Sequence, residues 1–465
     1  MLTLINTNTM QPAIAPVGLD YIAGSAKKAG IDVDIVDLCL ADDPDKTLRN
    51  YFAKSKPDLI GLSFRNVDDC FWPSCQWFVP RLAEIVQTIK HLTSAPIVIG
   101  GVGFSIFAKQ IVEHTGADFG VCGDGEQAIV SLYRELKDNK IIPRYSILDG
   151  RTNLPEQLLL PTSRDNIDNI TYFNRGGQIG IETKRGCNRN CIYCADRLSK
   201  GTSNRTRPPA EVADEAESLL AQGIDVLHIC DSEFNIPGRH AEAVCEEFIR
   251  RGLGSRLKWY TYMAVVPFDA DLASAMRKAG CVGIDFTGDS ASPAMLKTYR
   301  QPHTPETIAS AVRLCKDNGI KVMIDLLLGG PGETPQTAKQ TIDFIKQINP
   351  DCAGAPLGVR IYPGTEMVNI VAAEGQLETN RNIHCKYTGP VDLFRPTFYI
   401  SHLLGEKPAR LIKDLIAGDK RFFEPIDETD AVATDHNYND NTELVNAIKA
   451  GARGAYWHIL HKLRC

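Results

Sequence analysis

The sequence lacks the features that mark membrane, secreted and nucleic-acid-binding proteins. No uninterrupted apolar run approaches the roughly 20 residues that a membrane helix needs, and the first residues show no basic-then-apolar signal peptide. Neither sign of charge dominates, because 51 Lys and Arg are set against 57 Asp and Glu, for a formal charge of −6. We therefore expect a cytoplasmic protein with no membrane segment and no nucleic-acid partner.

Two common nucleotide-binding motifs are also missing. No GxGxxG follows the first apolar run, residues 2–6, which disfavours a dinucleotide-binding domain. The Gly-rich turn at residues 329–334 could be read as a phosphate loop, but no Lys-Ser or Lys-Thr follows it, which disfavours a nucleoside triphosphatase. Many of the 14 cysteines lie inside apolar patterns, as at Cys122, Cys245 and Cys315, and this fits free thiols better than disulfides.

From its start to about residue 140, the sequence alternates apolar strand-like runs with amphipathic helix-like segments. This alternation predicts an α/β fold whose parallel sheet is covered on both faces. Ligands of such sheets bind outside the carboxyl ends of the strands. The loops expected there are residues 7–12, 63–67, 100–103 and 123–126. Their glycines would let a bulky ligand approach the backbone, although tight turns use glycine for the same conformational freedom.

A second alternation follows a segment of different composition. Residues 141–178 are rich in Pro, Asn, Asp and Arg with little periodicity, and we expect them to link two domains. Residues 179–370 then repeat strand and helix patterns, too few for a closed eight-stranded barrel, so we expect an open, partial (β/α)6 TIM barrel with its active face at the carboxyl ends of the strands. The expected strands are residues 178–183, 226–230, 257–264, 283–287, 322–328 and 358–362.

The most specific motif is a short loop with three cysteines, Cys187, Cys191 and Cys194, in the spacing Cx3Cx2C. Three thiolates can hold three irons of a four-iron cubane and leave the fourth iron open, and an open position is typical of a reactive metal site. A zinc knuckle or a chance grouping is the alternative. Zinc sites usually pair two CxxC knuckles, and no fourth ligand lies close in sequence, although Cys230 and two histidines could approach in three dimensions.

With the aromatic Tyr193 directly before the third cysteine, this motif resembles that of the radical S-adenosylmethionine (radical SAM) superfamily. The Gly-rich loops of the first domain resemble the cobalamin (B12)-binding domain that precedes the cluster domain in one large subclass. The resemblance covers residues 1 to about 370. It implies a Rossmann-like (flavodoxin-like) cobalamin-binding domain at residues 1–140 and a radical SAM barrel at 179–370. It also implies a [4Fe-4S] cluster on the three cysteines, SAM, and cobalamin used as methylcobalamin.

The resemblance assigns cobalamin contacts to the four loops of the first domain. Many such domains carry DxHxxG after the first strand, with a His that ligates cobalt from below, but residues 7–16 contain neither Asp nor His. Arg65 is our candidate for the side chain that faces the lower side of cobalt, and a role in binding phosphate or propionate is an equal alternative. The implied cobalamin contacts are Thr9, Gln11, Pro12, Ser63, Arg65, Asn66, Val67, Gly100, Gly101, Val102, Gly103, Gly123 and Glu126.

The resemblance places SAM at the carboxyl ends of the barrel strands. The family's Gly-Gly-Glu turn, which binds the methionyl ammonium, is absent, and the sequence Asp231-Ser-Glu233 stands in its place. Gly288-Asp-Ser290 is similar to the family's Gly-Glu-Ser, but Asp and Ser are also ordinary helix caps. The implied SAM contacts are Tyr193, Asp231, Glu233, Tyr262, Gly288, Asp289, Ser290 and Arg360.

The last segment, residues 371–465, contains no metal motif, and we expect a small, mainly helical cap over the barrel mouth. Its aromatic and Asn residues would suit an aromatic or peptide substrate, and ordinary packing is the alternative. They gather at residues 394–399, 421–423, 436–439 and 456–457.

The resemblance implies an enzyme, a cobalamin-dependent radical SAM C-methyltransferase. It would move a methyl group from SAM through methylcobalamin to an unactivated carbon of an amino-acid residue in a peptide or protein, or of a small molecule. The amino-acid branch that includes tryptophan 2-C-methyltransferases is a candidate relative, and a low-potential donor of the flavodoxin or ferredoxin type would supply electrons. One alternative is a rearrangement or cyclisation without methyl transfer. Another is a non-catalytic corrinoid and iron–sulfur carrier or sensor, whose cluster is saturated by Cys230 or Cys385.

Overall fold

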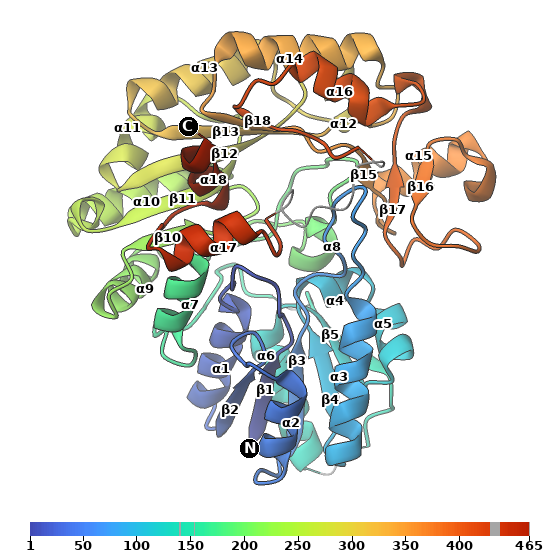
Figure 1. Cartoon of the computed structure of the whole chain (residues 1–465). Helices are drawn as coiled ribbons and strands as arrows, with labels where there is room; N and C mark the ends of the chain where they lie inside the picture. Colours follow the sequence, from blue (N-terminus) through green and yellow to red (C-terminus); the bar gives the residue numbers. More distant parts are fainter. Residues whose placement is uncertain (139–140, 153, 428–437, 465) are drawn as a thin grey trace.

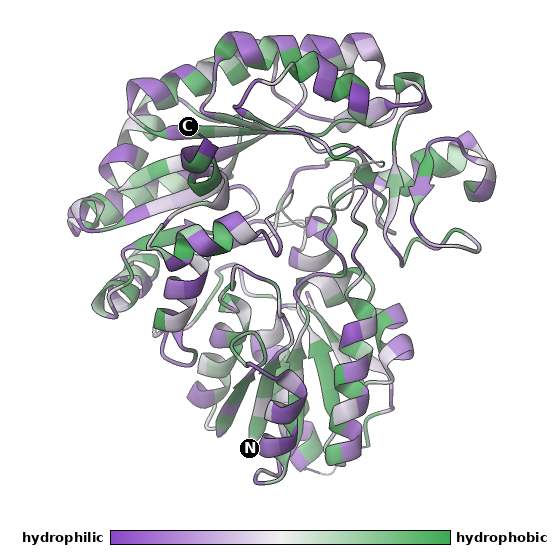
Figure 2. Ribbon diagram, viewed as in Figure 1, coloured by the Kyte–Doolittle hydropathy of each residue, from purple (hydrophilic) through white to green (hydrophobic). Residues whose placement is uncertain are grey.

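The computed structural model describes residues 1–138, 141–152, 154–427 and 438–464. Residues 436 and 437 of the expected aromatic cluster at 436–439 lie outside the described residues. Two parallel sheets are stacked end to end, the N-terminal one below and the C-terminal one above in Figure 1. Figure 2 shows that apolar residues concentrate on the strands, while polar residues cover the outer faces of the helices.

The first domain is a six-stranded parallel sheet in the order β2-β1-β3-β4-β5-β6. Its first strand is buried at all five positions, and its side chains alternate between two cores, with Leu4 in one and Ile5 in the other. The strands are β1 (Leu2–Asn6), β2 (Val33–Asp37), β3 (Leu59–Ser63), β4 (Ile97–Gly100), β5 (Phe119–Gly123) and β6 (Ser146–Gly150). The helices are α1 (Val17–Lys28), α2 (Pro44–Phe52), α3 (Val79–Leu92), α4 (Val102–Ile106), α5 (Ala108–Thr115) and α6 (Gly125–Lys137).

The segment expected to be a linker contains regular structure. Strand β6 pairs in parallel with β5 at the edge of the first sheet, so this sheet extends beyond residue 140. The strand has no fully buried position, and a half-exposed edge strand leaves no apolar run that a sequence pattern could show. Helix α7 (Asn169–Gly176) follows, with the Asp168 side chain accepting a hydrogen bond from the backbone N–H of Thr171 as its N-cap.

The second domain contains a seven-stranded parallel sheet in the order β18-β14-β13-β12-β11-β10-β7, with helices along its outer side in Figure 1. The strands are β7 (Ile179–Ile181), β10 (Val226–Ile229), β11 (Lys258–Ala264), β12 (Cys281–Asp289), β13 (Lys321–Leu326), β14 (Cys352–Gly354) and β18 (Phe422–Phe423). The helices are α8 (Asp196–Lys200), α9 (Pro209–Ala221), α10 (Gly238–Arg250), α11 (Ala270–Lys278), α12 (Pro293–Tyr299), α13 (Pro305–Asp317), α14 (Pro335–Ile348) and α15 (Glu366–Glu374). Thr334 caps α14 at the end of the Gly-rich turn, which is therefore structural.

The expected sixth barrel strand, at residues 358–362, is wrong. The sixth position belongs to β14, a three-residue strand of small side chains that carries no pattern of its own. Residues Val359–Arg360 form β15, which pairs antiparallel with β17 (Thr397–Tyr399) in a separate sheet completed by β16 (Ile383–Cys385). The short pair β8 (Lys184–Arg185) and β9 (Arg205–Thr206) lies next to the cysteine loop.

The C-terminal segment forms part of the second domain. It contributes β18 to the edge of the barrel sheet and the helices α16 (Pro408–Ile416), α17 (Thr442–Lys449) and α18 (Tyr456–Arg464). The hydroxyl of Tyr260 on β11 and Nδ1 of His458 on α18 share a hydrogen bond of 2.8 Å, which ties this helix to the sheet. Among the helices of the described residues, none is both long and apolar enough to cross a membrane.

Candidate functional site

A cavity of about 700 Å³ lies where the carboxyl ends of the two sheets face each other. The loops after the strands of the first domain form one wall. The barrel contributes His228, Cys230, Tyr262 and Asp285 to the opposite wall. The C-terminal segment closes one side, with Tyr438, Asn439, Ala455, Tyr456 and Trp457. A group bound in this cavity would therefore contact both domains at once.

Most of the residues expected to bind cobalamin line this cavity. Their loops follow β3, β4 and β5, so the parallel sheet brings them to one edge, as expected for an α/β domain. Arg65 reaches toward the barrel wall, because its charge contributes to the low pKa of His228 on β10. The expected residues that line the cavity are Ser63, Arg65, Asn66, Gly100, Gly101, Val102, Gly123 and Glu126.

The remaining expected cobalamin contacts, Thr9, Gln11, Pro12, Val67 and Gly103, do not line the cavity. Val67 is 3% exposed within the apolar core, and a Cβ on Gly103 would lie 2.9 Å from the backbone of Asn66. The backbone N–H of Gln11 donates to the Asp440 carboxylate at 3.2 Å, so this loop turns toward the C-terminal segment.

The cavity is not lined by residues 9–12. It is lined instead by Asn6, Asn8 and residues 14–19. They stand at the carboxyl end of β1 and the first turn of α1. The general rule for ligand position in parallel sheets could have indicated them.

Gly101 shows why one of these glycines is required. Its φ of 113° is unfavourable for other residues, and a Cβ at this position would lie 2.5 Å from the carbonyl oxygen of Phe64. The loops after β3 and β4 therefore touch through their backbones and present a flat wall to the cavity.

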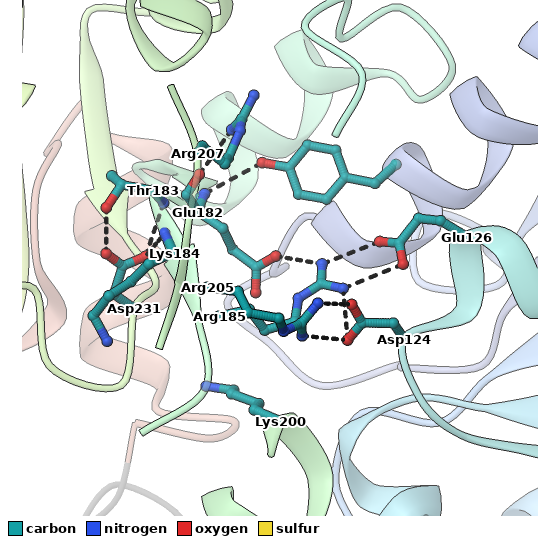
Figure 3. A network of polar contacts seen from close by, with 12 residues as sticks. Asp124, Glu126, Glu182, Thr183, Lys184, Arg185, Lys200, Arg205, Arg207 and Asp231 are labelled. Atoms are coloured by element: carbon teal, nitrogen blue, oxygen red, sulfur yellow. Dashed lines mark hydrogen bonds and ion pairs between the residues drawn. The ribbon is translucent and has the colours of Figure 1, made fainter. Parts of the chain in front are cut away.

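The loop after β5 is tied to the barrel by ion pairs (Figure 3). Arg185 contacts Glu126 at 3.0 Å, Asp124 at 3.1 Å and Glu182 at 2.6 Å. Arg205 adds a second contact to Asp124, at 2.7 Å. Burial alone would raise the pKa of Asp124, but the two arginines lower it below its ordinary value. Glu126 thus lines the cavity while its carboxylate is already bound, so its main role is to hold the domains together.

The three cysteines of the motif follow β8 in one loop. Burial raises the pKa of Cys191 to about 11 and also raises that of Cys187 and Cys194, and the charges of the three thiols affect one another. The Gln301 side-chain amide donates to Cys191 Sγ at 3.2 Å, a contact of the kind that tunes sulfur ligands of iron. Within the described residues no three His, Cys, Asp or Glu side chains converge on a single ion. This is compatible with a cubane, in which each thiolate ligates a different iron.

Asp231 orients the strand that leads into the cysteine loop. Its carboxylate accepts hydrogen bonds from the Thr183 backbone N–H at 2.8 Å, from the Thr183 hydroxyl at 2.5 Å and from the Lys184 backbone N–H at 3.2 Å (Figure 3). Both oxygens are therefore engaged. Asp231 lines the cavity, but these bonds already position the strand that leads into the cysteine loop, and its contact with SAM stays a prediction.

Tyr193 and Asp289, two of the expected SAM contacts, lie together next to the cysteines. The Tyr193 hydroxyl and the Gln301 amide each donate to Asp289 Oδ2 at 2.6 Å. Asp289 has a φ of 53°, an uncommon backbone conformation that turns its carboxylate toward the cysteine loop. Burial raises its pKa to about 7. The carbonyl of the adjacent Gly288 accepts a hydrogen bond of 3.0 Å from His303.

Glu233 carries an oxygen that has no partner. Thr287 donates to its Oε1 at 3.0 Å, while Oε2 is buried without a hydrogen bond. Burial raises the pKa of Glu233 to about 8. Such a carboxylate needs a donor to compensate its burial, and the methionyl ammonium of SAM is a donor of the right kind.

Two expected SAM contacts, Ser290 and Arg360, do not line the cavity. Ser290 is fully buried, and its hydroxyl lies 2.8 Å from that of Thr341 on α14, away from the cavity. Arg360 is 3% exposed and forms an ion pair of 2.9 Å with Asp68 of the first domain, so its charge is neutralised between the domains. Tyr262 lines the cavity and is 41% exposed, with its ring centroid 4.9 Å from that of His228.

Two family models match separate parts of the chain. The B12 binding domain matches residues 4–133, and the Radical SAM superfamily matches residues 181–345. The matched ranges correspond to the two sheets on either side of the cavity. The cysteine loop lies inside the second range.

Relatives with the same order of domains cover almost the whole chain. Tryptophan 2-C-methyltransferase of Streptomyces laurentii is 27% identical over 98% of this chain and 94% of its own length. The solved structure of the radical S-adenosylmethionine methyltransferase TsrM of Kitasatospora setae, with tryptophan and a SAM analogue bound, is 28% identical, covers 100% of this chain and 99% of its own, and has a TM-score of 0.91. A second TsrM structure contains cobalamin and a [4Fe-4S] cluster and has a TM-score of 0.88.

Proposed function

This chain is a cobalamin-dependent radical SAM methyltransferase, and we propose that it methylates a carbon of a free amino acid with an aromatic side chain. The similarity to a tryptophan methyltransferase over nearly the full length supports this substrate class. The observation that carries the proposal is the shape of the site. One cavity is shared by the two domains and closed by aromatic residues of the C-terminal segment, including Tyr438 and Trp457.

The residues of the chain divide the work around this cavity. When bound, SAM would supply the methyl group, cobalamin would carry it to the substrate carbon, and the cluster would bind SAM at its open iron. The cysteines at 187, 191 and 194 would hold the cluster, Glu233 would accept the SAM ammonium, and Asp289 would bind its ribose hydroxyls. The glycine loops at 100–103 would hold the corrin ring, with Arg65 toward the lower side of cobalt. Their common effect is to hold the reacting groups in line and to exclude water.

The test is anaerobic reconstitution of the purified chain with iron, sulfide and cobalamin, followed by incubation with SAM carrying a deuterated methyl group. Tryptophan, tyrosine and phenylalanine are offered singly, and short peptides with the same residues are offered in parallel. We expect a deuterated methyl group on carbon of a free amino acid, together with S-adenosylhomocysteine. Electrons are supplied in this assay by a chemical reductant. We expect that a reduced flavodoxin or ferredoxin can be used in its place.

Three other outcomes would contradict the proposal in different ways. Methylated peptide with no methylated amino acid would move the substrate to a protein or peptide. 5′-Deoxyadenosine without methyl transfer would indicate a rearrangement or cyclisation. A paramagnetic resonance spectrum of the reduced cluster that does not change when SAM is added would indicate a carrier with a saturated cluster.

A further inference from the structure

The interior of the barrel contains two acidic side chains that the sequence motifs do not include. Asp285 lies on β12 and Asp325 on the neighbouring strand β13. In the register of these strands Asp325 is opposite Thr287, two residues after Asp285. Residues two apart on a strand share a face, so both carboxyl groups are on the same side of the sheet. This is the side of the cavity, because Asp285 lines it.

Asp285 has no partner for one of its oxygens. The residue is 5% exposed, and its Oδ1 is buried without a hydrogen bond. An unsatisfied buried carboxyl oxygen is unfavourable unless a ligand arrives to satisfy it. Its neighbour Asp325 packs closely against β14. A Cβ on Gly354 would lie only 2.2 Å from the Asp325 carboxylate, so this position has room only for a glycine.

Among the described residues no lysine or arginine forms an ion pair with Asp285 or Asp325, although Arg65 lines the same cavity and its charge reaches His228. Burial, followed by the charges of Asp325 and Glu233, raises the pKa of Asp285 well above its ordinary value, and burial raises that of Asp325 to about 6. The neighbouring His228 is neutral, since burial lowers its pKa to about 4. In the strand register Asp285 lies opposite Tyr262 on β11 and Met323 on β13, and the charge of Glu233 reaches it. The pair is thus a negatively charged or proton-sharing site that no cation among the described residues pairs with.

We propose that Asp285, supported by Asp325, binds the ammonium group of the substrate. This assignment rests on the proposed function, because an amino acid brings such a group into the cavity. An ammonium has three N–H donors and a full positive charge, so it satisfies the free oxygen of Asp285 and offsets the repulsion between the two carboxylates. The aromatic faces of Tyr262 and Tyr438 would add a favourable environment for a cation.

The test compares ligands that differ in the amine, in the reconstituted holoenzyme with cobalamin and cluster bound. Tryptophan and tryptamine carry the ammonium, and 3-indolepropionate lacks it. Calorimetry should give the wild-type chain a preference for the amines of roughly 30-fold, the range of a buried charge-assisted hydrogen bond. In Asp285→Asn this preference should fall below about threefold, and Asp325→Asn should give an intermediate value.

A matched control separates this role from a general effect of the amide. Asp351 accepts a hydrogen bond from the Val322 backbone at 3.0 Å and pairs with Lys321 at 2.7 Å, at the end of β13 away from the cavity. Asp351→Asn should keep the wild-type preference. Methylation of bound cobalamin by SAM, without substrate, should be unchanged in Asp351→Asn. Asparagine has the shape of the protonated acid, so thermal unfolding of Asp285→Asn without substrate should occur no lower than in the wild type.

The outcomes separate this proposal from the proposed function. A chain that methylates an amino acid, but whose Asp285→Asn variant keeps the amine preference, overturns the role of Asp285 alone. A wild-type chain that methylates no amino acid overturns the proposed function. In that case the loss of tryptamine binding in Asp285→Asn still supports an ammonium site. A wild-type chain that binds none of the three probes overturns the ammonium site.

Discussion

The two domains on either side of the central cavity bury some of their carboxylates in different ways. On the side of the first domain, carboxylates that reach the barrel are paired with arginines, as with Asp20 and Arg164 at 2.6 Å and Asp68 and Arg360 at 2.9 Å. On the barrel side, Asp285 and Glu233 keep a buried oxygen without a partner. Burial of an unpaired carboxylate is costly, whereas a paired one is compensated by its partner. The comparison teaches that the paired charges form the frame that joins the domains, and that an unpaired carboxylate indicates a ligand site only where it also lines a cavity, as Asp285 does.

Without its cluster the barrel domain should lose methyl transfer completely, while cobalamin binding by the first domain should be unaffected. Cys191→Ala removes one of the three thiolates, and methyl transfer should fall by at least roughly 1,000-fold because SAM loses its site of activation. Iron content and product formation measure the loss. Cobalamin should remain bound, as measured by its absorbance after gel filtration. Loss of both cofactors would mean that the two walls do not bind their groups independently.

Breaking the paired frame should reduce stability strongly. Arg164 is fully buried and contacts Asp20 at 2.6 Å and Glu215 at 2.7 Å. Arg164→Met leaves the buried Asp20 carboxylate without a cation and Glu215 with Arg207 alone, and it should lower the free energy of unfolding by about 3–5 kcal/mol, measured by urea denaturation.

The control for this variant is Arg81→Met. Arg81 is 41% exposed and contacts Asp45 at 3.1 Å, and the loss of such a surface pair should cost less than about 1 kcal/mol. Equal effects of the two variants would contradict the distinction between frame and surface.

A single methyl group added at Gly101 should disturb the loops of the first domain and weaken cobalamin binding. Gly101→Ala forces a Cβ into contact with Phe64 at a φ of 113°, and the resulting strain of about 3 kcal/mol should weaken cobalamin binding roughly 100-fold. Titration of the apoprotein with cobalamin measures this change.

Gly18→Ala is the matched control, because Gly18 lines the same cavity but a Cβ there meets no atom within 4 Å. Its affinity for cobalamin should stay within a few-fold of the wild type. The iron content of both variants should be normal. A Gly101→Ala variant with normal affinity would show that the loop contact is not needed for binding.

Glu333 is an unpaired carboxylate away from the cavity. It tests how much the burial of such a group alone lowers the free energy of unfolding. Glu333 is fully buried in the Gly-rich turn with Oε1 unsatisfied, and burial raises its pKa to about 7. The folded state therefore holds this proton more tightly than the unfolded state. Stability should fall by about 2 to 3 kcal/mol as pH rises from the unfolded pKa, about 4.3, to the folded value, and then level off.

Glu333→Gln removes this titration. Compared with the wild type, the variant should gain stability progressively over the same pH range, as measured by urea midpoints at each pH. A constant difference at all pH values would mean that the Glu333 carboxyl does not titrate in the folded chain.

Local patterns were enough to predict the two sheets and the cysteine loop. Strands such as β1 and β13 are apolar runs because both of their faces are covered. A strand that is buried on both faces can therefore be recognised from its amino-acid composition. The cysteine spacing is local as well. In contrast, β14 has three small residues and β6 is a half-exposed edge strand, and neither carries a pattern that separates a strand from a loop.

Contacts over long distances were the main source of error. The resemblance implies a SAM contact for Arg360, but its ion-pair partner Asp68 lies 292 residues earlier in the chain. Ser290 has the right neighbours in sequence but turns toward Thr341 on another helix. Asp285 belongs to no motif, and it became a candidate only when its unpartnered oxygen was placed in the cavity.

The sequence by itself determined the two domains, their order and the three-cysteine loop, because periodicity and short spacings depend only on neighbours along the chain. Only the tertiary structure decided which buried carboxylates are neutralised and which keep an oxygen without a partner. The reason is that the charge of a buried group depends on what packs against it, and for this cavity the packing partners come from segments far apart in the sequence.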